Sequence, residues 1–331
     1  MHICGIMTVV KFLPNTLEHK ESKMKQVIFN VGGALSSYIE AYGKKILLDI
    51  GSSMDFNPII DFLFPLFNRR YGKSMEKRNI DQLIISHPHY DHLSAIKEFD
   101  AHFTATLITC PNDNQPQDKK YKINWELVDN QTDECIKYLK EKILVGRTPP
   151  LRPINPTDQF LYFIPPIDCE KANDLDPQNY TNNLSLVFYF RINGHKLFMP
   201  GDLMKDGMKY LIKNTSSLRS KLLEGVDILV APHHGLKSSF STYLFEHMKN
   251  CKTRCLNIIS EKQTNEDSNR VVDTRYSSKE FCSGVNNLSE NGSPVFQRKT
   301  SNGHIFIDYS QPDKPFFEII NDNDDLIKRF I

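Results

Sequence analysis

Four potential metal ligands stand directly after a short apolar run. Leu83 to Ile85 predicts a buried strand, and it is followed at once by His87, His89, Asp91 and His92. A chain that leaves a sheet in extended form points residues i and i+2 to one side, so His87 and His89 can meet one cation. Asp91 and His92 can turn back to a second cation. Imidazole and carboxylate suit zinc, manganese or iron, and the lack of cysteine argues against a closed structural zinc site.

The alternative is a surface loop that is merely rich in histidine. The distribution of histidines argues against it, because five of the eleven lie in two short motifs. Each motif follows a run of apolar residues that predicts a buried strand. The sequence therefore favours a metal site.

The run resembles the His-x-His-x-Asp-His signature of the metallo-β-lactamase superfamily. This resemblance implies an α/β fold, an αββα sandwich of two mixed sheets with helices on the outer faces. Leu47–Gly51 is similar to the family's early Asp-x-Gly strand end, which implies that Asp49 supports the metal loop from behind. Phe198–Asp202 is similar to the strand that ends in a bridging aspartate, which implies that Asp202 binds two cations. Taken alone, Gly201-Asp202 would indicate an ordinary turn.

Two adjacent histidines supply the last motif, at the end of the apolar run Asp227–Ala231. Adjacent side chains do not easily face the same ion. We therefore assign His233 to metal and His234 to substrate binding or proton transfer, with the reverse assignment kept open. A pair of core histidines is the structural alternative.

The motif His233–Ser239, together with Asn182–Val187, is similar to the soluble hydrolase domain of ComEC-like DNA-uptake proteins. The resemblance runs from about Val27 to Ile307. In that branch an Asn-x-x-Ser-Leu-Val segment stands where others have a third histidine. Asn182 and Ser185 are thus candidate substrate contacts, and one ion is expected to be held weakly.

The sequence departs from that branch at two places. The early Asp-Val-Gly-Gln-Gly-Asp element reads Asn30–Leu35 here, which removes both acids. A late Tyr-x-His-Pro element is reduced to Tyr276–Lys279, which leaves Tyr276 as a candidate substrate contact. Both changes bear on the substrate and spare the metal ligands.

Two divalent ions, Zn2+ or Mn2+, would activate a water molecule and stabilise negative charge on the substrate. The candidate catalytic residues are Asp91 or Asp202, to orient the water, and His234 or Lys237, to neutralise charge or protonate the leaving oxygen. Ser238 or Ser239 is expected to cap a helix running to Met248. A helix N-terminus beside Lys237 could hold a phosphate, which makes Ser238 a candidate substrate contact. An ordinary capped helix with a solvated lysine is the alternative.

Three functions remain open. The first is a phosphodiesterase or nuclease, because phosphate oxygens can fill an open metal position. The second is a small-molecule hydrolase acting on a lactone, a phosphocholine-type ester or a cyclic nucleotide. The third is a non-catalytic scaffold, which would have no need for six converging ligands. Basic runs at Arg69–Arg78 and Lys119–Lys122 could follow a nucleic-acid backbone, although a solvated surface is the preferred interpretation.

The remaining pattern predicts one domain over residues 1–331, with a core of about 26–310 and long insertions near 111–130 and 149–182. A helix is expected over Ile59–Phe64, ended by Pro65. Another is expected over Thr132–Leu144. Strands are expected at 26–30, 35–39, 45–50, 83–85, 105–110, 184–192, 196–199, 227–230, 256–259, 304–308 and 316–320.

Composition sets broad limits. The net charge of +1 gives no global reason to bind nucleic acid or an acidic membrane. No apolar run approaches the ~20 residues of a membrane span, and the start lacks the order of a secretory signal. The seven cysteines are scattered, and Cys251 and Cys255 are expected to be buried thiols. A reducing cytoplasm fits best, and the oligomeric state is left open.

Overall fold

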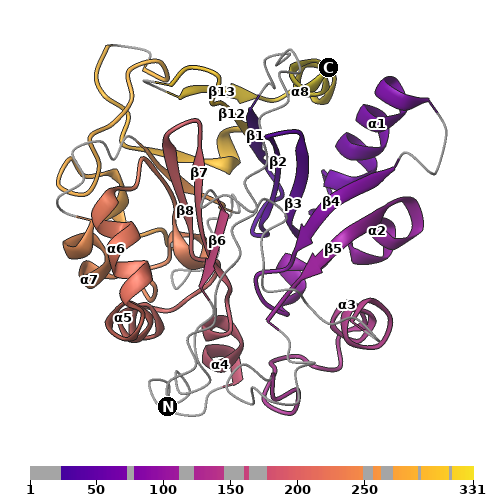
Figure 1. The fold of residues 1–331 in the computed structure, drawn as a ribbon, viewed down its shortest axis with the longest axis horizontal. Helices are drawn as coiled ribbons and strands as arrows, with labels where there is room; N and C mark the ends of the chain where they lie inside the picture. The colour runs from indigo at the N-terminus through magenta and orange to yellow at the C-terminus, as the bar shows by residue number, and fades with distance from the viewer. Residues whose placement is uncertain are drawn as a thin grey trace, which may run out of the picture.

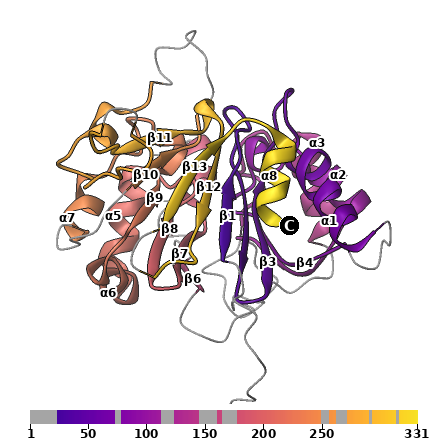
Figure 2. The ribbon, with the colours of Figure 1, turned by 90° about the horizontal axis from the view of Figure 1, so that it is seen from above.

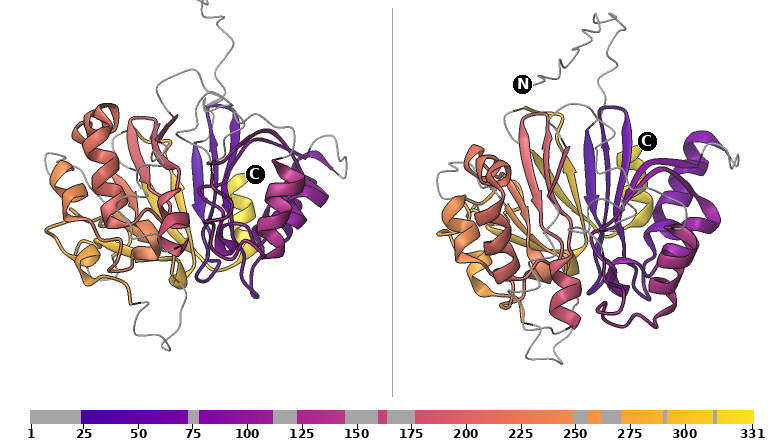
Figure 3. Two further views of the ribbon diagram at one scale, coloured as in Figure 1. Left: turned by 90° about the horizontal axis from the view of Figure 1, so that it is seen from below. Right: turned by 60° about the horizontal axis from the view of Figure 1, so that its bottom comes forward.

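Two β-sheets face each other in the protein, with helices on both outer faces (Figures 1 and 2). The computed structural model describes residues 24–72, 78–111, 123–144, 160–163, 177–248, 256–261, 271–289, 292–312 and 315–331. Figure 3 shows the same four layers from below. The αββα sandwich expected from the sequence is confirmed.

The first sheet has seven strands in the order β13-β12-β1-β2-β3-β4-β5. Neighbours are antiparallel from β13 to β3, and β3, β4 and β5 are parallel. The strands are β1 (Lys25–Ile28), β2 (Ser36–Ala41), β3 (Lys44–Ile50), β4 (Asn79–Ile84), β5 (Thr104–Thr109), β12 (His304–Asp308) and β13 (Phe316–Ile320).

The second sheet has six strands in the order β11-β10-β9-β8-β7-β6. Strands β8 to β11 are parallel, whereas β6, β7 and β8 are antiparallel. The strands are β6 (Phe160–Phe163), β7 (Val187–Ile192), β8 (His195–Met199), β9 (Ile228–Val230), β10 (Leu256–Ile259) and β11 (Gln297–Lys299).

Helices cover each sheet on the side away from the other (Figure 2). The first sheet is covered by α1 (Phe64–Tyr71), α2 (Ile96–His102), α3 (Glu134–Tyr138) and α8 (Asn323–Phe330). The second is covered by α5 (Lys205–Asn214), α6 (Ser216–Glu224) and α7 (Thr242–His247). A short helix, α4 (Pro177–Asn183), leads into β7.

Strand β7 shows why the central strands are apolar throughout. Phe188 and Phe190 point into the core between the sheets, whereas Val187 and Tyr189 pack against the helices. All four side chains are buried. A strand buried on both faces has no polar alternation, so its sequence is a continuous apolar run.

The parallel strands place the chemically active residues at one edge. Asp49 lies near the end of β3, and the His87–His92 loop follows β4 beside it. In the other sheet, Asp202 follows β8 and the His233-His234 pair follows β9 beside it. Since carboxyl ends of neighbouring parallel strands meet at one edge, each sheet brings two of these segments together.

The predicted strands are present, mostly within two residues of the expected bounds. Strand β7 starts three residues late because α4 occupies the chain up to Asn183. The prediction that Pro65 ends a helix was wrong. A π-helical segment, Pro58–Leu63, runs directly into α1, and Pro65 lies in the first turn of α1, where a missing N–H costs little.

Parts of both expected insertions are among the described residues. Residues 123–133 form hydrogen bonds with α4, and β6 and most of α4 lie within the second insertion. The helix expected over 132–144 is confirmed as α3 and a following π-helical turn, capped by Asp133. The core also continues past residue 310, because Phe317, Leu326 and Phe330 are buried.

Several predictions fall on residues that the structure does not describe. Lys73, Lys77, the Lys119–Lys122 run and the Cys251/Cys255 pair lie outside the described ranges. Within the described ranges, no helix is long and apolar enough to cross a membrane.

Candidate metal centre

The loop after β4 is held in place by Asp49. This fully buried carboxylate accepts hydrogen bonds from the backbone N–H of Ser86 (2.6 Å) and from its hydroxyl (2.7 Å). Its Oδ2 also lies 2.7 Å from Nδ1 of His92. A carboxylate that binds Nδ1–H fixes the tautomer of the ring, so Nε2 of His92 is the nitrogen left to bind a cation.

A close backbone approach completes the loop. The carbonyl oxygen of Asp91 accepts a hydrogen bond from the backbone N–H of Leu35. Gly51, at the end of β3, packs against the same carbonyl, and a Cβ there would overlap it. The Asp-x-Gly element therefore positions the metal loop through both of its named residues.

Asp202 comes from the opposite sheet and is almost fully buried. Its backbone N–H donates to the hydroxyl of Ser185 (2.9 Å). Ser185 is itself fully buried and holds the aspartate loop. Its contact with substrate stays a prediction. Gly201, with a φ of 58°, lies against the same serine, where a Cβ would clash.

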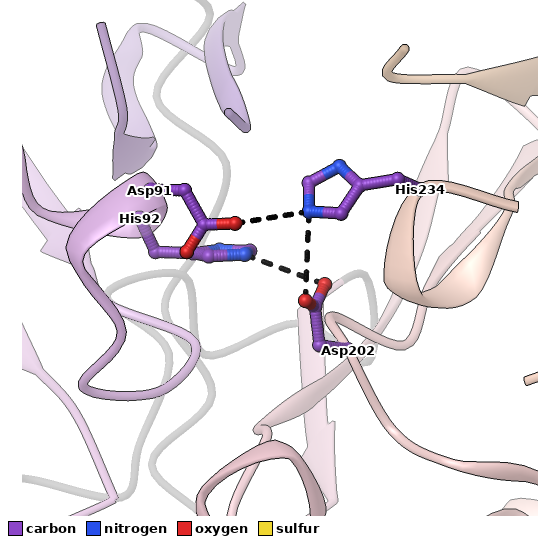
Figure 4. Close-up of side chains that lie close together, drawn as sticks. All are labelled: Asp91, His92, Asp202 and His234. Atoms are coloured by element: carbon purple, nitrogen blue, oxygen red, sulfur yellow. Dashed lines mark hydrogen bonds and ion pairs between the residues drawn. The ribbon is translucent and has the colours of Figure 1, made fainter. Parts of the chain in front are cut away.

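Figure 4 shows how the two sheets meet at this point: Asp91 and His92 project from one side, and Asp202 and His234 from the other. Oδ1 of Asp202 is 3.3 Å from Nε2 of His92, and Oδ2 is 3.5 Å from Nε2 of His234. Nε2 of His234 is also 3.2 Å from Oδ2 of Asp91. These four side chains form one group that could hold a metal ion.

A second group shares Asp202. It consists of His87, His89 and Asp202, and His87 is fully buried. Nε2 of His87 is 3.9 Å from Oδ2 of Asp202 and 2.9 Å from Nδ1 of His89. The one carboxylate common to both groups is the residue that the sequence predicts as the bridge.

The histidine pair is placed in the reverse of our preferred assignment. His234 joins the group with Asp91 and Asp202, and its Nδ1 faces the carbonyl of Ser260 at 3.1 Å. His233 lies farther out, with Nε2 4.0 Å from Oδ2 of Asp202 and Nδ1 3.1 Å from the hydroxyl of Ser239. Both residues have positive φ, 47° and 55°. This strained backbone turns adjacent rings in different directions, which the sequence pattern does not reveal.

The residues fit divalent cations. Nε2 of His92 is buried without a hydrogen-bond partner among the described residues. Nε2 of His92 is near Asp202 yet misaligned for a hydrogen bond. Buried polar atoms are normally paired, so an unpaired nitrogen beside the carboxylate of Asp202 indicates a group that faces a bound ligand rather than another side chain.

The charges agree with this interpretation. Burial, and then the neighbouring His92, lower the pKa of His87 well below its usual value. Burial also opposes charge on His234, but Asp202 and Asp91 outweigh it and raise its pKa to about 10. Asp202 keeps a low pKa despite burial because His92 and His234 are close. Positive charge is thus favoured on His234, beside the two carboxylates, which is where cations would bind.

Three predicted substrate or catalytic residues are not among the two ligand groups. Lys237 and Ser238 are exposed, and the charge of Lys237 acts on Asp273. Tyr276 is 1% exposed and packs against the ring of Phe240 at 4.9 Å, so it belongs to the core. The predicted caps at Ser238 or Ser239 were also wrong, because Ser241 caps α7. No helix therefore starts beside Lys237.

Asn182 lies at the end of α4, almost fully buried. Its Oδ1 has no hydrogen-bond partner among the described residues, and its Nδ2 is 3.8 Å from Sδ of Met204. The structure also shows Asp129, which sequence reasoning missed: its Oδ2 lies 3.8 Å from Nε2 of His89. A single aspartate in a polar segment carries no signal that could have identified it.

Solved structures with a similar fold are remote in sequence. YhfI from Bacillus subtilis, a metallo-β-lactamase fold protein, is 14% identical, with 71% of this chain and 85% of that chain covered and a TM-score of 0.35. A diphosphatase from the PhnP family is 12% identical, with 71% and 85% covered and a TM-score of 0.36. The short form of human tRNase Z is 12% identical, with 72% and 93% covered and a TM-score of 0.32.

A comparison with curated proteins finds no match. A family model does match: residues 29–166 fit the metallo-beta-lactamase superfamily. The matched range includes Asp49 and the whole His87–His92 run, the residues that build one side of the centre. The similarity to the metallo-β-lactamase superfamily therefore covers residues 29–166, which form part of the αββα sandwich.

Proposed function

We propose that the protein is a metal-dependent hydrolase that uses two divalent ions, Zn2+ or Mn2+, to cleave phosphodiesters. The observation that carries the proposal is the pair of ligand groups that share Asp202. His87, His89 and Asp202 would hold one ion. Asp91, His92, His234 and Asp202 would hold the other. Such ions supply an activated water at neutral pH and stabilise negative charge on the substrate.

The protein's own residues complete the chemistry. Asp91 is the more exposed of the two carboxylates, so its free oxygen can orient a water molecule at the rim of the centre. His233 faces Asp202 from the outer side, and burial lowers its pKa, so its ring is neutral. Ser239 fixes this ring through Nδ1, which leaves Nε2 to contact substrate or a leaving oxygen.

Phosphodiesters are favoured because the first group is incomplete. It offers three protein ligands, and Asn182 stands where the family resemblance implies a third histidine. Phosphate oxygens can occupy an open position at a metal. A lactone or lactam presents one carbonyl oxygen, so it is less suited than a phosphate to fill that open position.

The arginines at the start of the basic run Arg69–Arg78 favour a small phosphodiester over a long nucleic acid as the substrate. Arg70 makes two hydrogen bonds to Glu40, at 2.6 and 3.0 Å, and Arg69 pairs with Asp324 at 2.6 Å. Glu40 pairs with Lys45 near the start of β3, whereas Asp49, which holds the metal loop, lies near the end of that strand. The four residues from Lys45 to Asp49 rise by roughly 13 Å. A cyclic nucleotide or a phosphocholine-type ester therefore fits better than a polymer.

The test is hydrolysis by the purified protein with Mn2+ and, separately, with Zn2+. The panel contains single-stranded DNA, duplex DNA, RNA, cyclic nucleotides and a bis-aryl phosphodiester. We expect metal-dependent cleavage of the small diesters, lost in Asp202→Ala and His89→Ala. Glu246→Gln, which alters an exposed acid on α7, is the control and should keep full activity.

The alternatives give different results. Cleavage of DNA or RNA alone would establish a nuclease and contradict the preference for small substrates. Cleavage of lactones but no diester would show that the reaction is wrong and the site right. Two bound ions per chain with no hydrolysis of any ester would indicate a scaffold.

A further inference from the structure

The segment 123–133 reaches the metal centre from outside both motif loops. It is anchored on α4, because the backbone N–H of Asn124 donates to the hydroxyl of Tyr180 (2.8 Å). The backbone N–H of Asp129 donates to Oγ1 of Thr181 at the same distance. Ile123 and Val128 are buried in the core beneath. The position of Asp129 is thus fixed by contacts that do not involve its own carboxylate.

That carboxylate faces the outer nitrogen of a candidate ligand. Nε2 of His87 and Nδ1 of His89 converge at 2.9 Å, so Nδ1 is the nitrogen that His89 turns toward the centre. Its other nitrogen, Nε2, is buried and has no hydrogen-bond partner among the described residues. Oδ2 of Asp129, which accepts a hydrogen bond from Nδ2 of Asn130 (3.0 Å), lies 3.8 Å from it, just outside hydrogen-bond range.

We propose that Asp129 is a positioning residue for the metal centre: its carboxylate attracts the Nε2–H of His89 and so keeps Nδ1 deprotonated for binding. A neutral imidazole has one protonated nitrogen, and an acceptor beside Nε2 selects the tautomer with Nδ1 free. Histidine ligands usually donate their second N–H to a carboxylate or carbonyl, and loss of that partner typically weakens metal binding 10–100-fold. The inference rests on the proposed function, since it assigns His89 as a ligand.

Asp49 shows what such a partner does on the other ligand group. It contacts Nδ1 of His92 and leaves Nε2 for the centre, whereas Asp129 would act on Nε2 of His89 and leave Nδ1. The sequence places Asp49 in a motif but Asp129 in an insertion. The insertion would therefore supply one carboxylate, that of Asp129, to the proposed metal centre.

The experiment measures Zn2+ binding by calorimetric titration against a competing chelator. Asp129→Ala should weaken one of two zinc sites by about 10–100-fold. Asp129→Asn should recover part of the loss, because its amide oxygen still accepts a hydrogen bond. Glu126→Ala, which removes an exposed acid from the same segment, should bind as the unaltered protein does. Thermal unfolding in chelator should be nearly equal for all four proteins, because the bond to Thr181 uses the backbone N–H.

A second readout is the tautomer of His89, from nitrogen NMR on histidine-labelled, zinc-loaded protein. Its signal is identified by its loss in His89→Asn. We expect protonated Nε2 in the unaltered protein and a different pattern in Asp129→Ala. Equal zinc affinity in Asp129→Ala, or no recovery in Asp129→Asn, would overturn the inference. If the unaltered protein binds two zinc ions and Asp129→Ala binds them with the same affinity, only this inference fails. If the unaltered protein binds no zinc, the proposed function fails as well.

Discussion

Gly51 shows how one missing side chain shapes the metal centre. Its α-carbon lies against the carbonyl of Asp91, and a Cβ there would overlap that oxygen and crowd Ala34. The same carbonyl is bonded to the backbone N–H of Leu35, so the loop cannot simply move away. The side chain of Asp91 faces His234 from this backbone. A change at Gly51 should therefore be transmitted to the second ligand group.

Gly51→Ala should destabilise the protein by about 1–3 kcal/mol, the usual cost of overpacking, and lower its affinity for zinc. Gly43→Ala is the matched control: nothing lies within 4 Å of its Cβ position, but its φ of +72° makes alanine strained. It should lose stability and keep its zinc affinity. Urea unfolding and chelator competition measure the two quantities. Unchanged zinc affinity in Gly51→Ala would show that the loop does not depend on this approach.

At the residue scale, the sequence predicted which side chains the strand ends bring together. Asp49, His87 and Asp202 each lie at or just after the end of a strand, where residue type and spacing suffice. The choice between His233 and His234 could not be predicted, because it depends on two positive φ angles. The burial of Tyr276 likewise depends on aromatic residues of α7 and its neighbours, which only the folded chain brings together.

At the scale of elements, strands were easier to predict than helices. Apolar runs with turn residues between them gave every strand of the sandwich except β6 and β11. Helix α4 was not predicted because its sequence, PQNYTNN, shows no apolar residues at helical spacing. Its contacts are tertiary: Tyr180 and Thr181 both accept backbone hydrogen bonds from residues 123–133. Such a helix depends on its partner segment rather than on its own pattern.

The start of α7 offers a test of two neighbouring serines. Ser241 accepts a hydrogen bond from the backbone N–H of Leu244 and caps the helix, whereas Ser239 contacts Nδ1 of His233. Ser241→Ala should cost about 1 kcal/mol of stability in urea unfolding, as loss of a cap usually does, and leave kcat unchanged. Ser239→Ala should lower kcat because His233 loses its orientation. Equal effects of the two changes on kcat would contradict this division.

At the scale of the whole molecule, the metal centre joins the two halves of the sandwich. His87, His89, Asp91 and His92 belong to the first sheet, and Asp202 and His234 to the second. A ligand that binds only the folded state stabilises it by about 2.7 kcal/mol at a concentration 100 times its Kd. Metal removal should therefore loosen the contact between the sheets as well as abolish activity.

The prediction is a lower melting temperature after chelation, restored by Zn2+. Asp202→Asn, which alters the one carboxylate shared by both groups, should show little response to zinc. Glu246→Gln should respond as the unaltered protein does. Differential scanning calorimetry measures all three. A melting temperature that zinc does not change in the unaltered protein would mean that no ion bridges the sheets.

The junction of β12 with the rest of the fold depends on an uncharged histidine. His304 is 4% exposed, and its Nδ1 accepts a hydrogen bond from the backbone N–H of Asn30 (3.0 Å). Its Nε2 lies 3.3 Å from Oδ1 of Asn323 on α8. Burial lowers the pKa of His304 to about 4, although Asn323 opposes the shift. A proton on Nδ1 would also remove the acceptor that Asn30 uses.

This shift predicts a loss of stability in acid. Above pH ~6.5 the ring is neutral in both the folded and the unfolded chain, so it adds no pH dependence. Between pH ~6.5 and ~4 only the unfolded chain takes up the proton, and stability falls by roughly 3 kcal/mol in total. His304→Asn keeps an acceptor for Asn30 and cannot be protonated. Urea unfolding of chelated protein at pH 7.5, 6 and 5 should therefore show a smaller loss of unfolding free energy for the variant. The histidines of the metal centre contribute equally to both proteins. An equal loss of stability in the two proteins would show that His304 is not the group responsible.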